Sequence, residues 1–245
     1  MASTETNIMI PYIESVKEPV IAISKTETEA QKKQIKFVYK EKPVYDFFKR
    51  FFDIVFSIVA IIVLSPIFLI IAALIKLDDN GPLFYKQMRI GKNGKPFYIY
   101  KFRTMILNAD KFDYLLTPEH IEQYQKEFKI DDDPRITRVG KLLRGHSLDE
   151  LPQFYNSLIG NMSIVGPRPV LAEEVELFEP YKDVLLEVKP GITGNWQVNG
   201  RSNITYENFA RQILELSYIT NRSLVFDVKI LTNTFIVLLR KTGAK

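Results

Sequence analysis

The chain has 245 residues and a formal net charge of +4, a length that allows one sizeable globular domain with appended segments rather than two full domains. It has no cysteine and only two histidines, which excludes a disulfide framework, a thiolate zinc site and a histidine-rich metal site. The mild positive charge suits a membrane surface or an anionic substrate, and no run of lysine and arginine interleaved with aromatics indicates nucleic-acid binding.

The first part of the chain, residues 1–45, predicts a flexible extension. Short apolar stretches alternate there with threonine, glutamate, lysine and proline, without a sustained helical or strand period. No apolar core of signal-peptide length occurs in it, so secretion by a cleaved signal is not expected. We favour a plain tail, and recruitment of a partner is the alternative.

Residues 54–75 are almost wholly apolar and predict a membrane helix. At a rise of ~1.5 Å per residue this segment could reach ~33 Å. Ser65 and Pro66 fall near its middle, where proline removes a helix hydrogen bond and bends the axis. Basic residues flank both ends, which suits a helix that enters and leaves by the same face. The residues alone leave a re-entrant and a spanning helix equally open.

Residues 83–103 predict a β-hairpin, because two alternating segments are separated by a turn at Asn93 and Gly94. Lys101 and Arg103 share one face of the second segment, so we expect the two cations to project together. Such a pair could hold a phosphate. A solvated basic edge is the alternative.

A polar helix is predicted from Thr117 to about Phe128. The three aspartates at 131–133 resemble the motif by which many sugar-nucleotide glycosyltransferases hold a metal. Directly before a proline, however, such a run is more typical of a solvated turn, which we favour. A short helix is predicted over 139–143, and it places Arg144 shortly before the acidic residues at 149 and 150.

Asp149 and Glu150 are adjacent carboxylates followed by an apolar helical face, so we expect them at a helix N-terminus. The helix dipole there favours negative side chains and anionic ligands. One carboxylate could attack phosphorus while its neighbour holds a divalent metal. Ser147 and Glu150 also fit a capping box, the interpretation that the motif alone favours. Pro152 is comfortable only if the helix begins at Asp149 or later.

The segment 160–169 predicts a short apolar strand that leads into a rigid turn. Pro167 and Pro169 restrict the backbone on both sides of Arg168. An arginine fixed in this way suits bidentate recognition of phosphate, because its planar fork matches two oxygens. An ordinary surface arginine is the alternative.

After a tight turn at 189–194, two amides and an arginine follow the single tryptophan, Trp196. Gln197, Asn199 and Arg201 could contact a nucleotide. A lone tryptophan is more often a core residue, and that interpretation stays open.

Two helices are expected at the end of the chain, over 206–220 and 223–239. The second carries an apolar face and could lie on a membrane surface. Packing of that face into the core is the rival interpretation.

In combination these motifs resemble the bacterial sugar transferases known as monotopic phosphoglycosyl transferases, or polyprenyl-phosphate sugar-1-phosphate transferases. The matching segments, in the family's order, are 49–53, 65–66, 100–105, 133–137, 147–153, 166–169, 189–194 and 196–201. Each segment is weak alone, but the ordered set, over about residues 46–242, is highly specific.

The resemblance implies an α+β fold: a small, mostly helical catalytic domain with a β-hairpin, attached to the membrane by a kinked re-entrant helix and amphipathic interfacial helices. We therefore expect an extension over 1–45, a re-entrant helix over 46–76 that breaks at Ser65 and Pro66, and a cytoplasmic transferase domain over 77–245. The expected location is the cytoplasmic face of the bacterial cell membrane, with both termini in the cytoplasm.

The resemblance also implies an activity. Sugar 1-phosphate would pass from a UDP-sugar to polyprenyl (undecaprenyl) phosphate with release of UMP, as the first membrane step of capsule, exopolysaccharide or other glycoconjugate synthesis. Asp149 would form a phosphosugar aspartyl intermediate and Glu150 would hold Mg²⁺. Lys101, Arg144 and Arg168 match positions expected to bind phosphates. The weaker nucleotide-binding candidates are Gln197, Asn199 and Arg201.

The implied partners are a UDP-sugar, polyprenyl phosphate and membrane lipid, and the family allows downstream glycosyltransferases and a second copy of the chain as further partners. No nucleic acid is expected. Two rival functions are a scaffold of a polysaccharide assembly complex that has lost catalysis, and an ordinary metal-dependent glycosyltransferase using residues 131–133. The second rival would release the diphosphate instead of UMP. The sequence fixes neither the sugar nor a role for His146.

Overall fold

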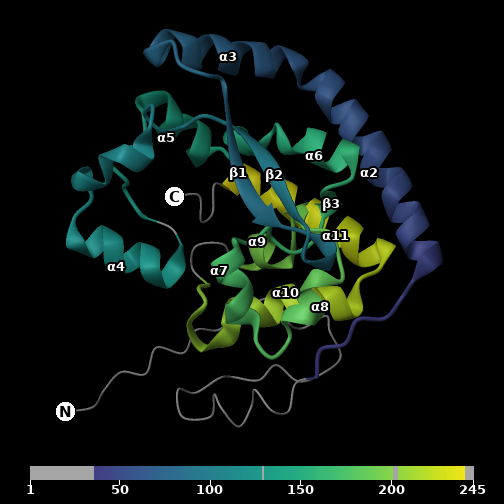
Figure 1. The fold of residues 1–245 in the computed structure, drawn as a ribbon. Helices are drawn as coiled ribbons and strands as arrows, with labels where there is room; N and C mark the ends of the chain where they lie inside the picture. The colour runs from purple at the N-terminus through teal and green to yellow at the C-terminus, as the bar shows by residue number, and fades with distance from the viewer. Residues whose placement is uncertain (1–35, 129, 201–203, 241–245) are drawn as a thin grey trace. The chain divides into compact units, whose positions relative to one another are not determined.

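The computed structural model describes residues 36–128, 130–200 and 204–240 (Figure 1). From Phe37 onward the chain forms one compact unit. Its helices are α2 (Pro43–Val63), α3 (Ser65–Asp79), α4 (Pro118–Glu127), α5 (Arg138–Gly145), α6 (Gln153–Ile159), α7 (Ala172–Val175), α8 (Lys182–Leu186), α9 (Asn195–Asn199), α10 (Ala210–Asn221) and α11 (Leu224–Arg240). Its strands are β1 (Phe84–Ile90), β2 (Pro96–Phe102), β3 (Ser163–Val165) and β4 (Gly191–Thr193). The predicted mostly helical α+β domain is confirmed.

Most of the expected extension, residues 1–35, lies outside the described residues. The part that is described packs against the domain. Phe37 is buried and meets the ring of Tyr181 edge to face, with the ring centroids 5.1 Å apart. The Lys42 ammonium donates to the Arg222 carbonyl at 2.7 Å, and α2 begins at the next residue.

The predicted β-hairpin is confirmed, with β1 and β2 paired antiparallel from Phe84 opposite Phe102 to Ile90 opposite Pro96. Asn93 and Gly94 both have positive φ angles, 60° and 70°. Asparagine and glycine adopt this left-handed conformation at low cost, which is why the two residues form the turn.

The second sheet has two parallel strands, β3 and β4, with Ser163 opposite Gly191 and Val165 opposite Thr193. The predicted strand before the proline-rich turn is thus confirmed. A Cβ atom on Gly191 would lie 2.1 Å from the Gly166 amide nitrogen, so only glycine permits this close approach. The turn after β3 is thereby held against β4.

Helix α6 is joined to the hairpin through one buried amide. Asn156 accepts a hydrogen bond from the Tyr100 amide at 3.0 Å and donates to the Tyr98 carbonyl at 2.7 Å. These two backbone groups lie on the edge of β2 that β1 does not pair, and Asn156 takes the place of a further strand. The contact sets the position of α6, and of the acid pair before it, relative to β2.

Helices α2 and α3 meet at a sharp break at Leu64 and are bent by 59° relative to each other. Within the described residues no single helix has both the length and the hydrophobicity needed to cross a membrane, although the bent pair together has both. Pro66 lies in the first turn of α3, and the Ser65 hydroxyl donates to the Ile62 carbonyl at 2.8 Å. The predicted break at Ser65 and Pro66 is confirmed.

The bent pair carries many exposed apolar side chains: Val44, Phe47, Phe48, Phe51, Phe52, Val55, Phe56, Ile58, Val59, Ile62, Val63, Ile67, Leu69, Ile70 and Leu77. Its other face is attached to the domain. The Asp53 carboxylate accepts hydrogen bonds from the Ser163 hydroxyl and the Ile164 amide, both at 2.9 Å. The Arg50 guanidinium donates to two carbonyls near the end of α6, at 2.7 and 2.8 Å. Figure 1 shows α2 passing α6 and β3, with which it is in contact.

The second half of α3 contributes to the core. Ile71 and Ile75 form a buried apolar cluster with Phe102 of β2 and Leu143 of α5. The bent pair is therefore fixed at both of its ends, by polar contacts on α2 and by apolar packing on α3.

The interpretation that the last helix packs into the core is confirmed for one face of α11. Ile230 is buried, and the Thr234 and Thr193 hydroxyls are 2.8 Å apart, so one face packs on β4. Val225 and Phe235 are exposed on the helix, as are Val228, Ile236 and Leu238. Part of its apolar surface thus remains uncovered by the described residues.

The Asn156 contact predicts a specific loss of stability. Asn156→Ala leaves a strand amide and a strand carbonyl without their partner, and we expect a loss of about 2 kcal/mol, measured by thermal unfolding of the purified protein in detergent. Asn221→Ala removes the same atoms at an exposed position where the amide donates only to the Ser217 carbonyl, and serves as the control. Equal changes in the two variants would contradict the bridging role.

Candidate active site

The acid pair lies in a single 3-10 turn, η3 (Leu148–Glu150), between α5 and α6. Ser147 adopts a left-handed conformation with φ 55°, and its side chain makes no capping hydrogen bond, so the capping box is wrong. Helix α6 begins at Gln153, directly after Pro152. The acid pair thus precedes the helix instead of occupying its first turn, because the proline closes the turn and its missing N–H costs nothing at that position.

Asp149 is buried, with 8% of its surface exposed. Within the described chain no amide of α6 donates a hydrogen bond to its carboxylate. Burial raises the pKa of the Asp149 carboxyl; Lys101 and Arg144 oppose this shift by their charge, and Glu150 adds to it. The carboxylate oxygens are therefore not taken up by a helix end, as the nucleophile hypothesis requires.

Lys101 and Glu150 form an ion pair of 2.8 Å beside Asp149. The expectation that Lys101 and Arg103 project together is wrong. Arg103 follows the last residue of β2 and turns into the protein, where it donates to the Pro82 carbonyl at 2.7 Å. Its backbone amide still donates to the Leu83 carbonyl at 2.9 Å, but its guanidinium binds the loop carbonyls of Pro82 and Met105.

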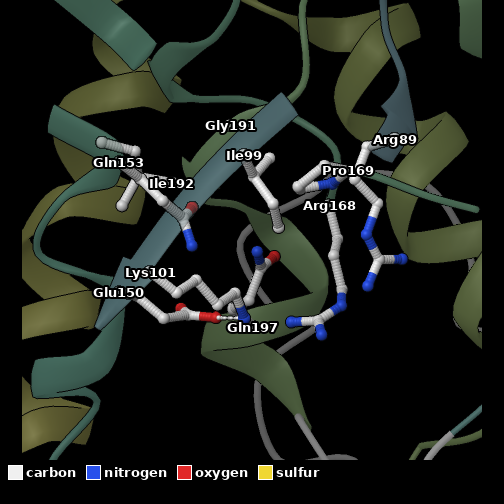
Figure 2. A pocket seen from close by; sticks show the side chains of 10 residues that line it. All are labelled: Arg89, Ile99, Lys101, Glu150, Gln153, Arg168, Pro169, Gly191, Ile192 and Gln197. Atoms are coloured by element: carbon white, nitrogen blue, oxygen red, sulfur yellow. Dashed lines mark hydrogen bonds and ion pairs between the residues drawn. The ribbon is translucent and has the colours of Figure 1, made fainter. Parts of the chain in front are cut away.

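A pocket opens next to this ion pair (Figure 2). The space between its atoms, open solvent included, is about 250 Å³. It is lined by Arg89, Ile99, Lys101, Glu150, Gln153, Arg168, Pro169, Gly191, Ile192 and Gln197. The structure thus brings together four of the predicted site residues, which lie far apart in the sequence: Lys101, Glu150, Arg168 and Gln197.

Arg144 and Asp149 do not line this pocket. The Arg144 side chain donates to the Thr104 hydroxyl at 2.9 Å. Burial lowers the pKa of its guanidinium, and the charges of Asp149, Asp133 and Glu150 oppose the shift. Arg144 is thus a partly buried cation near the acid pair that does not line the pocket.

The predicted nucleotide-binding residues do not lie together in the structure. Gln197 lines the pocket, whereas the Asn199 amide donates to Asn195 at 2.7 and 2.8 Å and stabilises α9. Arg201 lies outside the described residues. The Trp196 indole donates to the Ile204 carbonyl at 2.8 Å, and a guanidinium, that of Arg211, lies 4.2 Å from the centre of its ring. The internal contacts of Trp196 favour a structural role over base recognition.

The aspartates at 131–133 do not form a metal site. Asp133 is buried and pairs with the Arg135 side chain, which donates to it at 2.9 to 3.3 Å. In residues 36–128, 130–200 and 204–240 no cluster of three metal-ligating side chains occurs. The predicted solvated turn is confirmed for Asp132, which is exposed with φ 51°, and is wrong for Asp133, which is buried.

Glu150 and Asp149 nevertheless fit Mg²⁺ by the chemistry of their donor atoms. Magnesium is usually held by one or two carboxylates together with substrate phosphates, without a complete cage of protein ligands. Glu150 faces the pocket and supplies such a carboxylate. The Lys101 ammonium occupies the same carboxylate at 2.8 Å and would compete with a metal for it.

Sequence reasoning missed Arg89, which lines the pocket from β1. Its guanidinium donates to Glu174 at 2.9 Å and to Gln87 at 2.7 Å. The hairpin register gives the signal that could have found it, because Gln87 pairs with Ile99 and Tyr85 with Lys101. Alternate residues of β1 therefore share the pocket face of β2.

Sequence reasoning also missed Glu215, a residue of α10 with only 1% of its surface exposed. Its Oε1 accepts a hydrogen bond from the Arg168 backbone amide at 3.1 Å. Burial raises the pKa of Glu215 to about 7, against the opposing charges of Arg211 and Arg168. This carboxyl group holds the turn that presents Arg168.

The pattern of the family described as bacterial sugar transferase matches residues 44–241. The exopolysaccharide production protein ExoY of Sinorhizobium fredii is 42% identical over 196 residues, which cover 79% of this chain and 86% of ExoY. The undecaprenyl-phosphate galactose phosphotransferase of Salmonella typhimurium is 43% identical over 201 residues, 81% of this chain and 42% of that protein.

A third relative is the UDP-N-acetylgalactosamine-undecaprenyl-phosphate N-acetylgalactosaminephosphotransferase of Aeromonas hydrophila. It is 39% identical over 207 residues, which cover 83% of this chain. The chain matches 46% of the Aeromonas protein, so it spans less than half of this relative and of the Salmonella protein.

Glu215 predicts a dependence of stability on pH. Its ordinary pKa is 4.5 and its folded-state pKa is about 7, so between these values the folded protein keeps a proton that the unfolded chain has lost. Raising the pH through this window should destabilise the protein by on the order of 3 kcal/mol at most.

Glu215→Gln retains an oxygen acceptor for Arg168 and cannot ionise, so it should lack this loss. The check is chemical unfolding of both proteins across the window, with the difference between them growing as the pH rises. Parallel curves would show that Glu215 does not titrate in the folded protein as inferred.

Proposed function

Because the chain belongs to the bacterial sugar transferase family, we propose that it transfers sugar 1-phosphate from a UDP-sugar to undecaprenyl phosphate and releases UMP. The observation that carries the proposal is the acid pair Asp149–Glu150 beside Lys101, at a pocket that Arg168 also lines. Relatives named for the transfer of galactose phosphate and N-acetylgalactosamine phosphate to undecaprenyl phosphate support the same reaction class.

In the first step an oxygen of the Asp149 carboxylate attacks the sugar-linked phosphorus of the donor. A bond forms between this oxygen and phosphorus, and the bond from phosphorus to the bridging oxygen breaks. UMP leaves with the electron pair of that bond, and sugar phosphate remains on Asp149. Lys101 and Arg168 bind donor phosphates and reduce the repulsion between the two anions.

In the second step an oxygen of the lipid phosphate attacks the same phosphorus, and Asp149 leaves as a carboxylate. The product is a polyprenyl diphosphate sugar. The covalent intermediate separates the two substrates in time, which suits a donor from the aqueous phase and an acceptor from the lipid phase. Asp149 must be ionised for the first step, and the charges of Lys101 and Arg144 favour that state.

Glu150, with Asp149 and the donor phosphates, would hold Mg²⁺. When bound, the ion supplies charge neutralisation at the reacting phosphates. Glu150 would otherwise repel the donor, and its ion pair with Lys101 reduces that repulsion in the protein itself.

The same proposal places the bent pair α2–α3 in the cytoplasmic leaflet as a re-entrant helix, with both of its ends on the cytoplasmic side. The 59° bend and the exposed apolar side chains of both helices support it. The exposed residues of α11, such as Val225 and Phe235, would rest in the same membrane surface.

The nucleophile is tested with a UDP-sugar labelled in the sugar. The unaltered protein, without acceptor, should retain label and release one UMP per label, whereas Asp149→Asn should lose both by at least about 1,000-fold, since an amide is a poor nucleophile. Glu150→Gln should slow Mg²⁺-dependent turnover strongly without unfolding the protein. Asp132→Asn, at an exposed aspartate, is the matched control.

Labelling of the Asp149→Asn protein would show that Asp149 is not the nucleophile. Release of UDP in place of UMP would favour an ordinary glycosyltransferase. A folded protein that releases neither nucleotide would favour the scaffold.

The re-entrant arrangement is tested with single cysteines, because the chain has none of its own. Phe47 and Leu77 are exposed residues near the two ends of the bent pair, and each is replaced singly by cysteine. Both should react with a membrane-impermeant maleimide in inverted vesicles and neither in intact cells, whereas Val63→Cys, next to the break, should react in neither. Labelling at residue 77 in intact cells would instead show a spanning helix.

A further inference from the structure

Two arginines line one side of the pocket, across from the ion pair of Lys101 and Glu150. Figure 2 shows the guanidinium of Arg168 between that ion pair and the guanidinium of Arg89 in this view. Arg89 comes from β1 and Arg168 from the turn after β3. Two segments that are far apart in the sequence thus each contribute a guanidinium group to the pocket wall.

These two guanidiniums have donors to spare. An arginine side chain has five N–H donors, and Arg89 uses one on Glu174 and one on Gln87. Among the residues that the structure describes, the Arg168 side chain makes no hydrogen bond, and its group lies 5.6 Å from the centre of the Trp196 ring. A ligand with several acceptor oxygens would satisfy donors that the protein leaves unused.

The charges around the two arginines also favour an anion. Burial lowers the pKa of Arg89, and the nearby charge of Arg168 contributes to the shift, while Glu174 opposes it. A third arginine, Arg211, lies behind them, 3.6 Å from Glu174. Glu215, the other buried carboxyl there, has a pKa raised by burial to about 7. Arg89 and Arg211 thus share the carboxylate of Glu174, whose pKa these two cations help to lower, and Arg168 has no ion pair among the described residues.

Both arginines are held in place before any ligand binds. Glu174 and Gln87 fix the guanidinium of Arg89. Glu215 fixes the backbone of Arg168, and the Trp196 ring lies beside its side chain. Donors that are already oriented need no reorganisation when charge develops near them.

We propose that Arg89 and Arg168 form the subsite for the phosphate of the leaving nucleoside monophosphate, an inference that rests on the proposed function. When the bridging bond breaks, its electron pair stays on the UMP phosphate, which gains one negative charge. Two guanidiniums bind this phosphate more tightly than the diphosphate of the intact donor, so the contact is strongest after bond cleavage begins. Arg89 is then a catalytic residue, and the sugar-linked phosphate lies towards Lys101.

The donor therefore has a defined direction in the pocket. Its sugar phosphate faces Asp149, Glu150 and Lys101, and its nucleoside phosphate faces β1 and the turn after β3. The same subsite predicts product binding, because UMP carries the phosphate that the arginines recognise and uridine does not.

The experiment measures binding of UMP and of uridine to the full-length protein in detergent by isothermal titration calorimetry. The fluorescence of Trp196, the single tryptophan, is a second signal from the subsite. Two variants guard against misfolding. Arg89→Lys keeps a cation opposite the Glu174 carboxylate, and Arg89→Gln combined with Glu174→Gln removes both charges of the ion pair. Arg138→Gln, an exposed arginine at the start of α5, is the control.

We expect the Kd of UMP to rise at least tenfold in both Arg89 variants and to stay within twofold of the original in Arg138→Gln. The binding of uridine should be weak in all four proteins. Unchanged UMP binding in both Arg89 variants would overturn the subsite. Equal weakening of UMP and uridine would also overturn it, because the variants would then have altered the pocket and not a phosphate contact.

The binding experiment is independent of the covalent step. UMP is a product of that step, and its binding needs no phosphosugar on Asp149. If no protein retains label from the donor while the Arg89 variants lose UMP selectively, the proposed transfer fails and the phosphate subsite stands.

Discussion

The buried carboxylate of Asp53 ties an apolar helix to the catalytic domain, and the arrangement of the site depends on that contact. It accepts two hydrogen bonds from the start of β3, the strand that leads into the turn of Arg168. One helical turn earlier, Arg50 binds carbonyls at the end of α6, the helix that follows the acid pair. A single face of α2 therefore positions both of the segments that supply the chemistry. An isolated carboxylate on an apolar helix would be costly, and β3 satisfies it.

Behind the pocket the protein uses buried charges where a purely apolar core would be the more stable choice. Arg89, Arg211 and Tyr206 converge on Glu174, and Arg211 lies 4.2 Å from the ring centres of both Trp196 and Tyr206. Buried ion pairs contribute little net stability because desolvation offsets their attraction. Their effect here is on position, since each contact restricts an arginine at or behind the pocket wall. Such a network keeps cations ready for an anionic substrate.

The parts of the fold that local chemistry decides could be predicted from the sequence. The hairpin follows from the Asn93–Gly94 turn and from strand alternation, and the helix break follows from Ser65 and Pro66. Side chains whose direction depends on distant segments could not be predicted in this way. Arg103 turns towards the carbonyl of Pro82, which lies 21 residues earlier in the chain. Motif order alone could not show that the pocket would be completed from β1.

The acid pair also combines one feature that the local sequence predicts with one that depends on distant segments. Its place before α6 follows from the proline, but the burial of Asp149 comes from the surrounding fold. Burial raises the pKa of Asp149, which works against the nucleophilic role that we propose for it, because that role requires the ionised carboxylate. A donor diphosphate would add further negative charge and raise that pKa again. Lys101 and Arg144 offset the effect at the carboxylate, and Arg89 and Arg168 offset it on the donor side of the pocket. The reaction that we propose accounts for the number of cations around Asp149, because in it two anions must meet before a bond can form between them.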